Sequence, residues 1–331
     1  MNLINILKYS YIQARIKYLL VNFLDEEKYE EIKRINQIEE LFEKLNNTIY
    51  KKIFEEKTKL NYSILSKKIN YFHYELTKYL LNYLRGEVKN LFLLIIEKYD
   101  IEKLFLIIRK KIKGKKDLEK LNNPENIINE ISKENYINKQ NIEKKIKEYQ
   151  EQINQIKNKE EGNIIFYLEK SIIENYYKKL IKQINKFSRK EKEIIWQFIG
   201  VEIDFEKLLL ALRIKFFYPQ IVNKIENYLL SIEYQIKNKE IKKILEEEKE
   251  IIDNLNKKIL IKYKIEIKDE EDKNKILEQI AEIYDKKLEK LIRKTFLYNQ
   301  FSFGIILAFL YKLKRDYKLI TQKIKEIELN R

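Results

Sequence analysis

The chain of 331 residues contains no cysteine, five glycines and two prolines. Without cysteine, it cannot form disulfides, use a thiolate nucleophile or bind zinc through sulfur. Hairpin turns and bulges depend on glycine and proline, so their scarcity argues against a β-rich fold. The residues that dominate instead are Leu, Ile, Lys and Glu. This composition predicts an all-α protein.

The chain also lacks the usual signatures of catalysis and nucleotide binding. Its glycines stand singly, at Gly86, Gly114, Gly162, Gly200 and Gly304. Phosphate-binding loops need closely spaced glycines, so neither a P-loop nor a dinucleotide fingerprint is present. His73, the single histidine, lies in a helical aromatic run, which favours a packing or surface role over a catalytic one. No carboxylate pair stands out as acid and base. We therefore predict a non-enzyme with no catalytic residue, no cofactor and no metal.

Charge and hydropathy indicate the general class of the protein. Hydrophobic residues make up 44% of the chain, enough to build folded cores despite the high charge. The formal net charge of +16 favours acidic partners, such as nucleic acid, anionic lipid headgroups or an acidic protein face. Residues Met1–Ser10 show no signal peptide, and the apolar stretches Leu91–Ile96 and Phe301–Tyr311 are shorter than the ~20 residues a membrane-spanning helix needs. We expect a soluble or peripheral protein without a transmembrane segment.

Two segments of the chain repeat one pattern. Residues 66–113 and 170–217 align without gaps, and each contains an Asp followed nine residues later by an Arg. These residues are Asp100 and Arg109 in the first copy, and Asp204 and Arg213 in the second. A fainter third copy carries Asp316 and Lys325 at the matching positions. Three repeated units of roughly 100 residues are the simplest interpretation.

The repeated Asp residues precede apolar runs of helical period. Asp100 and Asp204 are therefore predicted to cap helices that end near Gly114 and Pro219. Nine residues of helical rise place each Arg about 13 Å along the axis from its Asp, too far for a direct pair. The Asp and the Arg must then serve different purposes.

Helical spacing and the positions of the two prolines suggest how the chain divides. Met1–Leu24 and Glu26–Phe54 carry apolar residues at three and four spacings, which predicts one helix in each. The predicted linkers are Lys113–Asn126 and Tyr218–Asn223, because they hold the only prolines. The predicted domains are residues 1–115, 116–218 and 219–331.

A cluster of basic residues supports a competing hypothesis. It consists of Arg109, Lys110, Lys111, Lys113, Lys115 and Lys116. Such a cluster could bind phosphates, with Tyr and Phe supplying base stacking. Lysines near a helix C-terminus are equally favoured by the helix dipole. A basic helical scaffold that binds nucleic acid or another acidic partner therefore remains as an alternative.

The three-fold repeat also resembles a known family, the C subunit of archaeal and bacterial V-type ATPases, called subunit d in the eukaryotic enzyme. The residues that carry the likeness are the repeated Asp, Leu and Arg, the N-terminal Tyr11, Ala14, Arg15, Leu19 and Leu20, then Leu45, Thr48 and Tyr50, and finally Phe301, Ser302, Phe303, Phe309, Leu310, Tyr311 and Lys312. The chain departs from the family at Lys103 and Lys207, where Asn is usual. It also departs at Leu313 and Arg315, where acidic residues are expected.

The resemblance implies a non-catalytic role. Family members contain three similar helical domains arranged as a funnel around a pseudo-threefold axis. The funnel lies on the membrane rotor ring at the cytoplasmic face and receives the foot of the central stalk. Such a rotor couples proton or sodium ion transport to ATP synthesis or hydrolysis. On this basis Arg109, Arg213 and Lys325 are expected at interfaces between domains or with the stalk.

Overall fold

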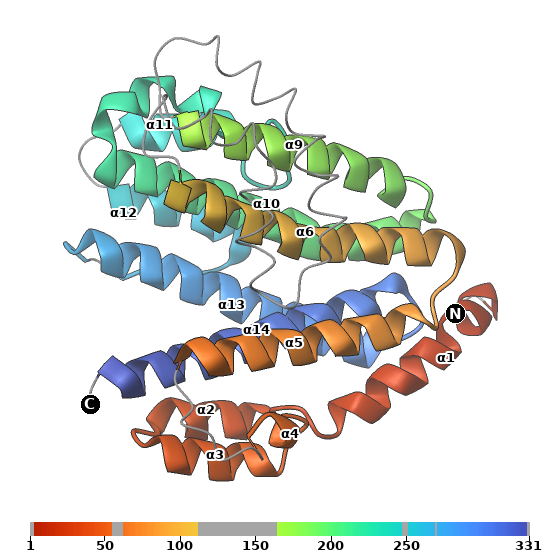
Figure 1. Cartoon of the computed structure of the whole chain (residues 1–331). Coiled ribbons are helices and arrows are strands. Elements are labelled where there is room, and N and C mark those ends of the chain that lie inside the picture. Colours follow the sequence, from red (N-terminus) through yellow and green to blue (C-terminus); the bar gives the residue numbers. More distant parts are fainter. Residues whose placement is uncertain (1–2, 55–61, 112–163, 247–250, 269, 330–331) are drawn as a thin grey trace. The chain divides into compact units, whose positions relative to one another are not determined.

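The computed structural model describes residues 3–54, 62–111, 164–246, 251–268 and 270–329. All regular structure in these ranges is helical, and they contain no strand (Figure 1). The predicted all-α class is thus confirmed. The predicted linker Lys113–Asn126 and half of the basic cluster, Lys113, Lys115 and Lys116, lie outside the described residues.

The chain forms two compact units. Unit 1 comprises Met1–Lys89 and Glu289–Arg331, and unit 2 comprises Asn90–Leu288. The boundaries between the units fall within two long helices, α6 (Gly86–Lys111) and α13 (Lys273–Tyr298). They do not coincide with the predicted domain boundaries, and the three-domain division stays a prediction.

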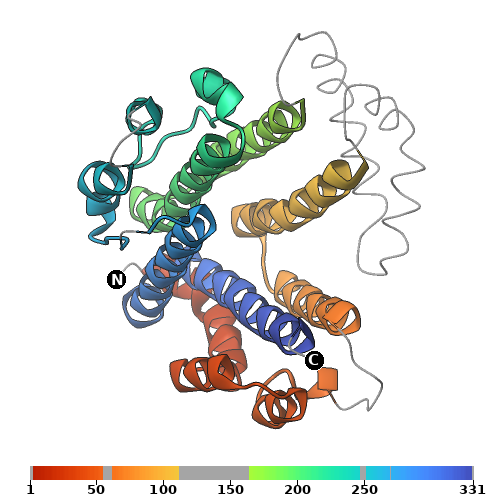
Figure 2. The same ribbon diagram turned by 90° about the vertical axis from the view of Figure 1, so that its left-hand side faces the viewer.

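Unit 1 is built around α14. Its helices are α1 (Leu3–Leu20), α2 (Glu26–Arg34), α3 (Ile38–Asn46), α4 (Lys51–Phe54), α5 (Tyr62–Leu81) and α14 (Phe303–Leu329). Figure 2 shows α14 with α5 on one side and α1 and α2 on the other, and α14 contacts all three. Every residue from Phe303 to Leu313 is buried, which makes the first half of α14 the centre of this unit.

The N-terminal part of unit 1 corrects one prediction and supports another. The helix expected over Met1–Leu24 is present as α1, whereas the single helix expected over Glu26–Phe54 is wrong. Three short helices occupy that segment, because the backbone becomes extended at Ile35 and Gln37 and turns again at Asn47. Asp25 caps the first of them, and its side chain accepts a hydrogen bond from Lys28 N at 2.9 Å.

Unit 2 is built around α10. It contains most of α6 and α13, together with α9 (Ile164–Ile184), α10 (Arg189–Phe217), the 3₁₀ helix η2 (Pro219–Asn227), α11 (Asn238–Glu246), α12 (Ile251–Asn254), the π-helix η3 (Leu255–Ile259) and the 3₁₀ helix η4 (Leu260–Tyr263). In Figures 1 and 2, α9 and α10 run side by side. The predicted end of α10 near Pro219 is confirmed, and the predicted linker Tyr218–Asn223 mostly forms the start of η2.

The repeat seen in the sequence recurs as a pattern of helices. The pairs α5–α6, α9–α10 and α13–α14 each consist of a long helix, a connection and a second long helix. The connections are residues 82–85, 185–188 and 299–302, four residues in every case. The third copy, faint in the sequence, therefore has the same local architecture as the other two.

The predicted helix caps are corrected by this pattern. Asp100 lies in the interior of α6 and Asp204 in the interior of α10, so neither begins a helix. The residue that caps α10 is Ser188, whose hydroxyl accepts from Glu191 N at 3.4 Å. The apolar run before each Asp belongs to the same helix as the run after it. An aspartate in that position needs another role for its side chain.

Candidate functional site

Asp204 holds an irregular loop of unit 2 against α10. Its side chain is completely buried, and its Oδ2 atom accepts three hydrogen bonds. The donors are Gln235 N at 2.7 Å, Ile236 N at 2.9 Å and the Tyr263 hydroxyl at 2.6 Å. Charge-assisted bonds of this kind are about twice as strong as neutral ones. The carboxylate thus supplies the partners that the loop backbone does not find within a helix or sheet.

Lys207 completes this centre one helical turn later. It is buried, and its Nζ donates to Ile236 O at 3.0 Å and to Asn238 Oδ1 at 3.1 Å. The same Nζ lies 3.8 Å from Asp204 Oδ1. Burial lowers the pKa of Lys207, while the Asp204 carboxylate opposes that shift. Lys207 is one of the departures from the family pattern, and these contacts give it a structural purpose.

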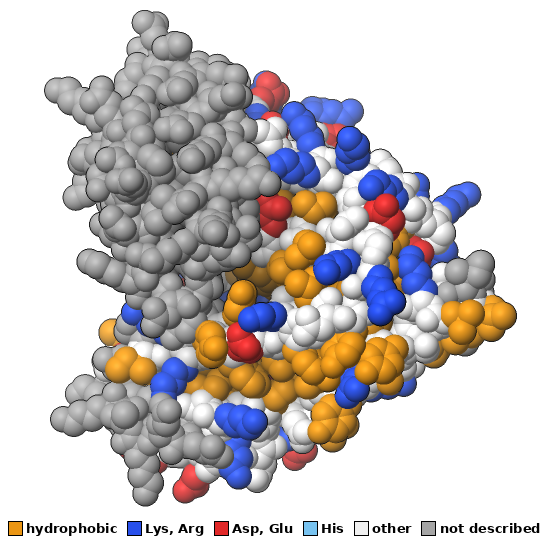
Figure 3. Space-filling view, turned by 45° about the vertical axis from the view of Figure 1, so that its right-hand side comes forward, with side chains coloured by type: hydrophobic (Ala, Val, Ile, Leu, Met, Phe, Trp, Pro, Cys, Tyr) orange, Lys and Arg blue, Asp and Glu red, His pale blue; other side chains and the backbone are white. Residues whose placement is uncertain are grey.

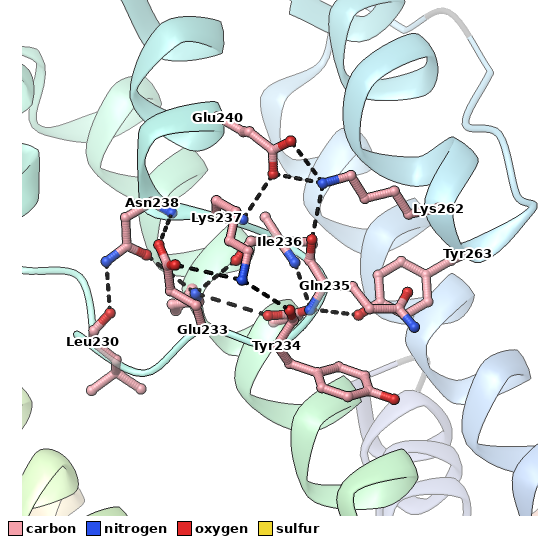
Figure 4. Close-up of polar contacts among 12 residues, drawn as sticks. Leu230, Glu233, Tyr234, Gln235, Ile236, Lys237, Asn238, Glu240, Lys262 and Tyr263 are labelled. Carbon is pink, nitrogen blue, oxygen red and sulfur yellow. Dashed lines mark hydrogen bonds and ion pairs between the residues drawn. The ribbon is translucent and has the colours of Figure 1, made fainter.

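Other side chains fix the rest of the loop. Figure 4 shows Glu240 accepting from the backbone N of Lys237 and from Nζ of Lys262. Lys262 also donates to Gln235 O at 2.9 Å. Close to this loop, Gly200 lies under the ring of Tyr234, and a Cβ added there would come within 2.4 Å of the ring. The loop therefore packs directly on the backbone of α10.

Asp316 forms the matching centre of unit 1. It is fully buried in α14 and accepts hydrogen bonds from the hydroxyls of Tyr29 and Tyr50, the latter at 3.0 Å. Lys312 Nζ lies 3.1 Å from Asp316 Oδ1 and also donates to Leu24 O. Burial raises the pKa of Asp316 and lowers the pKa of Lys312, although each opposes the shift of the other. Asp316 thereby joins α14 to α2 and to the turn before α4.

His73 extends the Asp316 centre. Its Nε2 lies 3.1 Å from the Tyr50 hydroxyl, and its ring packs against Phe72 and Tyr317. Burial lowers the pKa of His73 to about 3, so the imidazole is neutral near pH 7. These contacts agree with the packing role expected from the sequence.

The three aligned basic residues differ in their contacts. Arg109 forms a two-bond pair with Glu169 of α9, with Nε–Oε1 and Nη2–Oε2 distances of 2.6 and 2.7 Å. Its side chain is 52% exposed, and the Glu169 hydrogen bond raises its pKa. Arg213 and Lys325 are exposed and have no partner within the described residues. Of the three aligned positions, Arg109 therefore links two helices, whereas Arg213 and Lys325 present exposed positive charges.

Sequence reasoning missed a buried ion pair in unit 2. Lys98 of α6 lies 3.2 Å from Glu202 and 2.6 Å from Glu206, and it donates to the Tyr177 hydroxyl at 2.8 Å. Burial disfavours its charge, yet the two carboxylates raise its pKa. A signal was available, because Lys98 and Glu202 occupy matching places in the two aligned segments. In this chain the two residues at that repeated position carry opposite charges and pair with each other.

Within the described residues, no group of three His, Asp or Glu side chains is arranged to hold a metal ion. None of the helices that the structure describes combines the length and apolarity needed to cross a bilayer.

The described residues thus form an all-helical protein in which buried polar side chains tie helices and loops together. The model of one family, the ATP synthase (C/AC39) subunit, matches residues 12–322. The chain therefore belongs to this family of V-type ATP synthase subunits, as the sequence motifs indicated. No curated protein sequence matches it significantly.

Proposed function

We propose that the chain is the non-catalytic socket of a rotary V-type ATPase or ATP synthase. In this role it joins the central stalk to the membrane rotor ring, so that proton or sodium ion transport is linked to ATP synthesis or hydrolysis. The observation that carries the proposal is the family match, which extends over residues 12–322. The three repeated units would form the funnel, at the cytoplasmic face of the membrane.

Buried polar centres support a role in transmitting torque. A socket must deform little under load, and closely packed interiors have low compressibility. Asp316 connects residues 266 and 287 positions away in the sequence through Tyr50 and Tyr29. Asp204 connects α10 to residues 31 to 59 positions further along the chain. Both units thus contain fully buried cross-links that resist relative movement of their own elements.

The exposed cations suggest how partners would be recognised. Arg213 and Lys325 are open at matching positions of the second and third repeats, and the net charge of the chain is +16. Positive surfaces speed and orient association with acidic partners. Acidic faces of the stalk or the ring would therefore be the natural contacts for these residues.

Coupling can be tested by removing the subunit from the enzyme in its native membranes. Without the socket, we expect ATP hydrolysis by the catalytic head to continue while ATP-driven ion uptake into membrane vesicles is lost. Adding back the purified wild-type chain should restore uptake. Ion uptake that persists in membranes lacking the chain would contradict the proposal.

Partner identity can be tested separately by purifying the tagged chain from native membranes in mild detergent. Recovery of stalk and ring subunits in constant proportion is expected. The double variant R213E/K325E should recover less of them, whereas Lys52→Glu, a charge reversal at an exposed lysine outside the repeats, should not. Recovery of nucleic acid without these subunits would instead favour the basic scaffold.

A further inference from the structure

Helix α1 has two apolar faces, and unit 1 uses one of them. Tyr9, Ile12 and Ile16 are buried against the rest of the unit. The other face is exposed and consists of Leu3, Leu7, Tyr11, Ala14, Tyr18 and, directly after the helix, Val21. Leu7, Tyr18 and Val21 are 74%, 70% and 78% exposed. Figure 3, in which the right-hand side of Figure 1 comes forward, shows a band of hydrophobic side chains across the lower part of that face. We call these six exposed residues the α1 seam.

The spacing of the α1 seam is that of a helix-pairing surface. From Leu7 onward its members are separated by four, three, four and three residues, the spacing of a and d positions in a coiled coil. A stripe restricted to these positions is narrower than the apolar face of a helix that packs on a globular core. A seam of this width matches the contact surface of a single partner helix.

The residues that flank the α1 seam are basic. In the same heptad frame, Lys8 and Arg15 occupy e positions and Lys17 occupies a g position. No Asp or Glu occurs before Asp25. Charges at e and g positions select the partner of a coiled coil. The flanks therefore favour acidic residues on the partner and disfavour pairing of α1 with a second copy of itself.

One part of the α1 seam is fixed in place before any partner binds. Arg15 Nη2 donates to the Tyr11 hydroxyl at 2.8 Å, and its guanidinium carbon lies 5.1 Å from the centre of the Tyr11 ring. The Tyr11 ring also packs on Tyr83, in the connection between α5 and α6, with centroids 5.2 Å apart. Side chains held in this way lose less conformational entropy on binding.

From these observations we propose that the α1 seam docks one amphipathic α-helix of another polypeptide, with an apolar a/d stripe and acidic residues beside it. A lipid surface fits the geometry less well. Membrane-surface helices bury a broad apolar face, whereas the seam is narrow and the opposite face of α1 already belongs to the core. The socket function assigns no role to the α1 seam. Docking of a helix on this seam and the socket function can therefore each be wrong without affecting the other.

The test measures binding of a synthetic peptide to the full-length protein by fluorescence anisotropy. The probe is a labelled three-heptad helix with Leu at a and d and Glu at e and g, used below the concentration at which it self-associates. A matched peptide has Lys at e and g. We expect the acidic peptide to bind about tenfold more tightly or better, because like charges oppose the second complex.

A protein variant separates seam binding from general attraction to a basic chain. The double variant L7N/Y18N keeps the charge and changes only exposed side chains, and it should weaken binding of the acidic peptide by about tenfold or more. Ile261→Asn, which alters an exposed residue of unit 2, should leave it unchanged, with circular dichroism confirming both folds. Failure of the acidic peptide to bind, or equal binding by L7N/Y18N, would overturn the proposal. So would seam-dependent binding to phosphatidylserine vesicles in place of the peptide.

Discussion

Asp316 in unit 1 and Asp204 in unit 2 occupy matching positions of the repeat but hold different kinds of structure. Both are fully buried in the interior of a long helix, and both have a lysine within 4 Å. Asp204 accepts from two backbone N–H groups and one tyrosine, through a single oxygen. Asp316 accepts from two tyrosines and a lysine, through both oxygens.

The difference shows what the repeat preserves. A carboxylate can accept about four hydrogen bonds, so the same residue can stabilise a loop in one unit and neighbouring helices in another. Asp100, at the first matching position, is only partly buried. The second and third copies of the repeat therefore share a buried carboxylate acceptor, Asp204 in α10 and Asp316 in α14. The groups that donate hydrogen bonds to it differ between the two units.

The largest effect is expected from removing the Asp316 carboxylate. Asp316→Ala would leave buried Lys312 without its carboxylate and two tyrosine hydroxyls without their acceptor. The free energy of unfolding should fall by about 3–5 kcal/mol, as measured by urea denaturation. Asp253→Ala, which removes an exposed carboxylate, should change it by less than about 0.5 kcal/mol. Equal effects of the two variants would show that Asp316 is not a centre of stability.

Changing each Asp to Asn tests whether hydrogen-bond pattern distinguishes the two centres. Asp204→Asn can keep its three hydrogen bonds through one oxygen, at a cost of about 1 kcal/mol for the lost charge near Lys207. In Asp316→Asn, the new NH₂ group must replace an oxygen that accepts, so the cost should reach about 2–3 kcal/mol. Calorimetric melting of both variants would decide. A larger loss for Asp204→Asn would mean that charge, rather than bonding pattern, governs both sites.

Much of this arrangement was predictable from the sequence, for identifiable reasons. Composition and helical spacing predicted the all-α class, and the repeat predicted the equivalence of Asp204 and Asp316. The capping role failed because an Asp before an apolar run resembles a helix start even when the preceding run continues the same helix. Local spacing contains no signal for the donors of Asp316, since Tyr29 and Tyr50 are brought to it only by the tertiary fold.

A pH titration would sharpen the comparison further, because the single histidine lies at the Asp316 centre. The folded pKa of His73 is about 3, below its ordinary value of 6.5. As pH falls below 6.5, the unfolded chain takes up a proton that the folded chain does not, so stability is lost between pH 6.5 and 3. Between pH 7 and 5 this linkage should cost about 1–2 kcal/mol.

His73→Gln cannot titrate and should lose that part of the pH dependence. Urea denaturation at pH 7 and pH 5 measures the difference directly, with the slope of the wild-type chain as the reference. Because Asp316 also has a shifted pKa, only the difference between the two proteins reports on His73. Identical slopes would mean that His73 is open enough to protonate in the folded chain.

The smallest effects on stability should come from replacing the aligned arginines. Arg109 pairs with a residue of another helix, whereas Arg213 has no partner within the described residues. Arg109→Ala removes the two-bond pair with Glu169, but half of the arginine side chain is exposed and solvent screens the pair. The loss of unfolding free energy should therefore not exceed about 1 kcal/mol. This loss should shrink in high salt, and Arg109→Lys should recover only part of the lost stability, because Lys cannot form both bonds.

Arg213→Ala should leave the melting temperature unchanged at any salt concentration, yet reduce recovery of the assembled complex. A fall in melting temperature for Arg213→Ala would instead give this residue a structural role like that of Arg109.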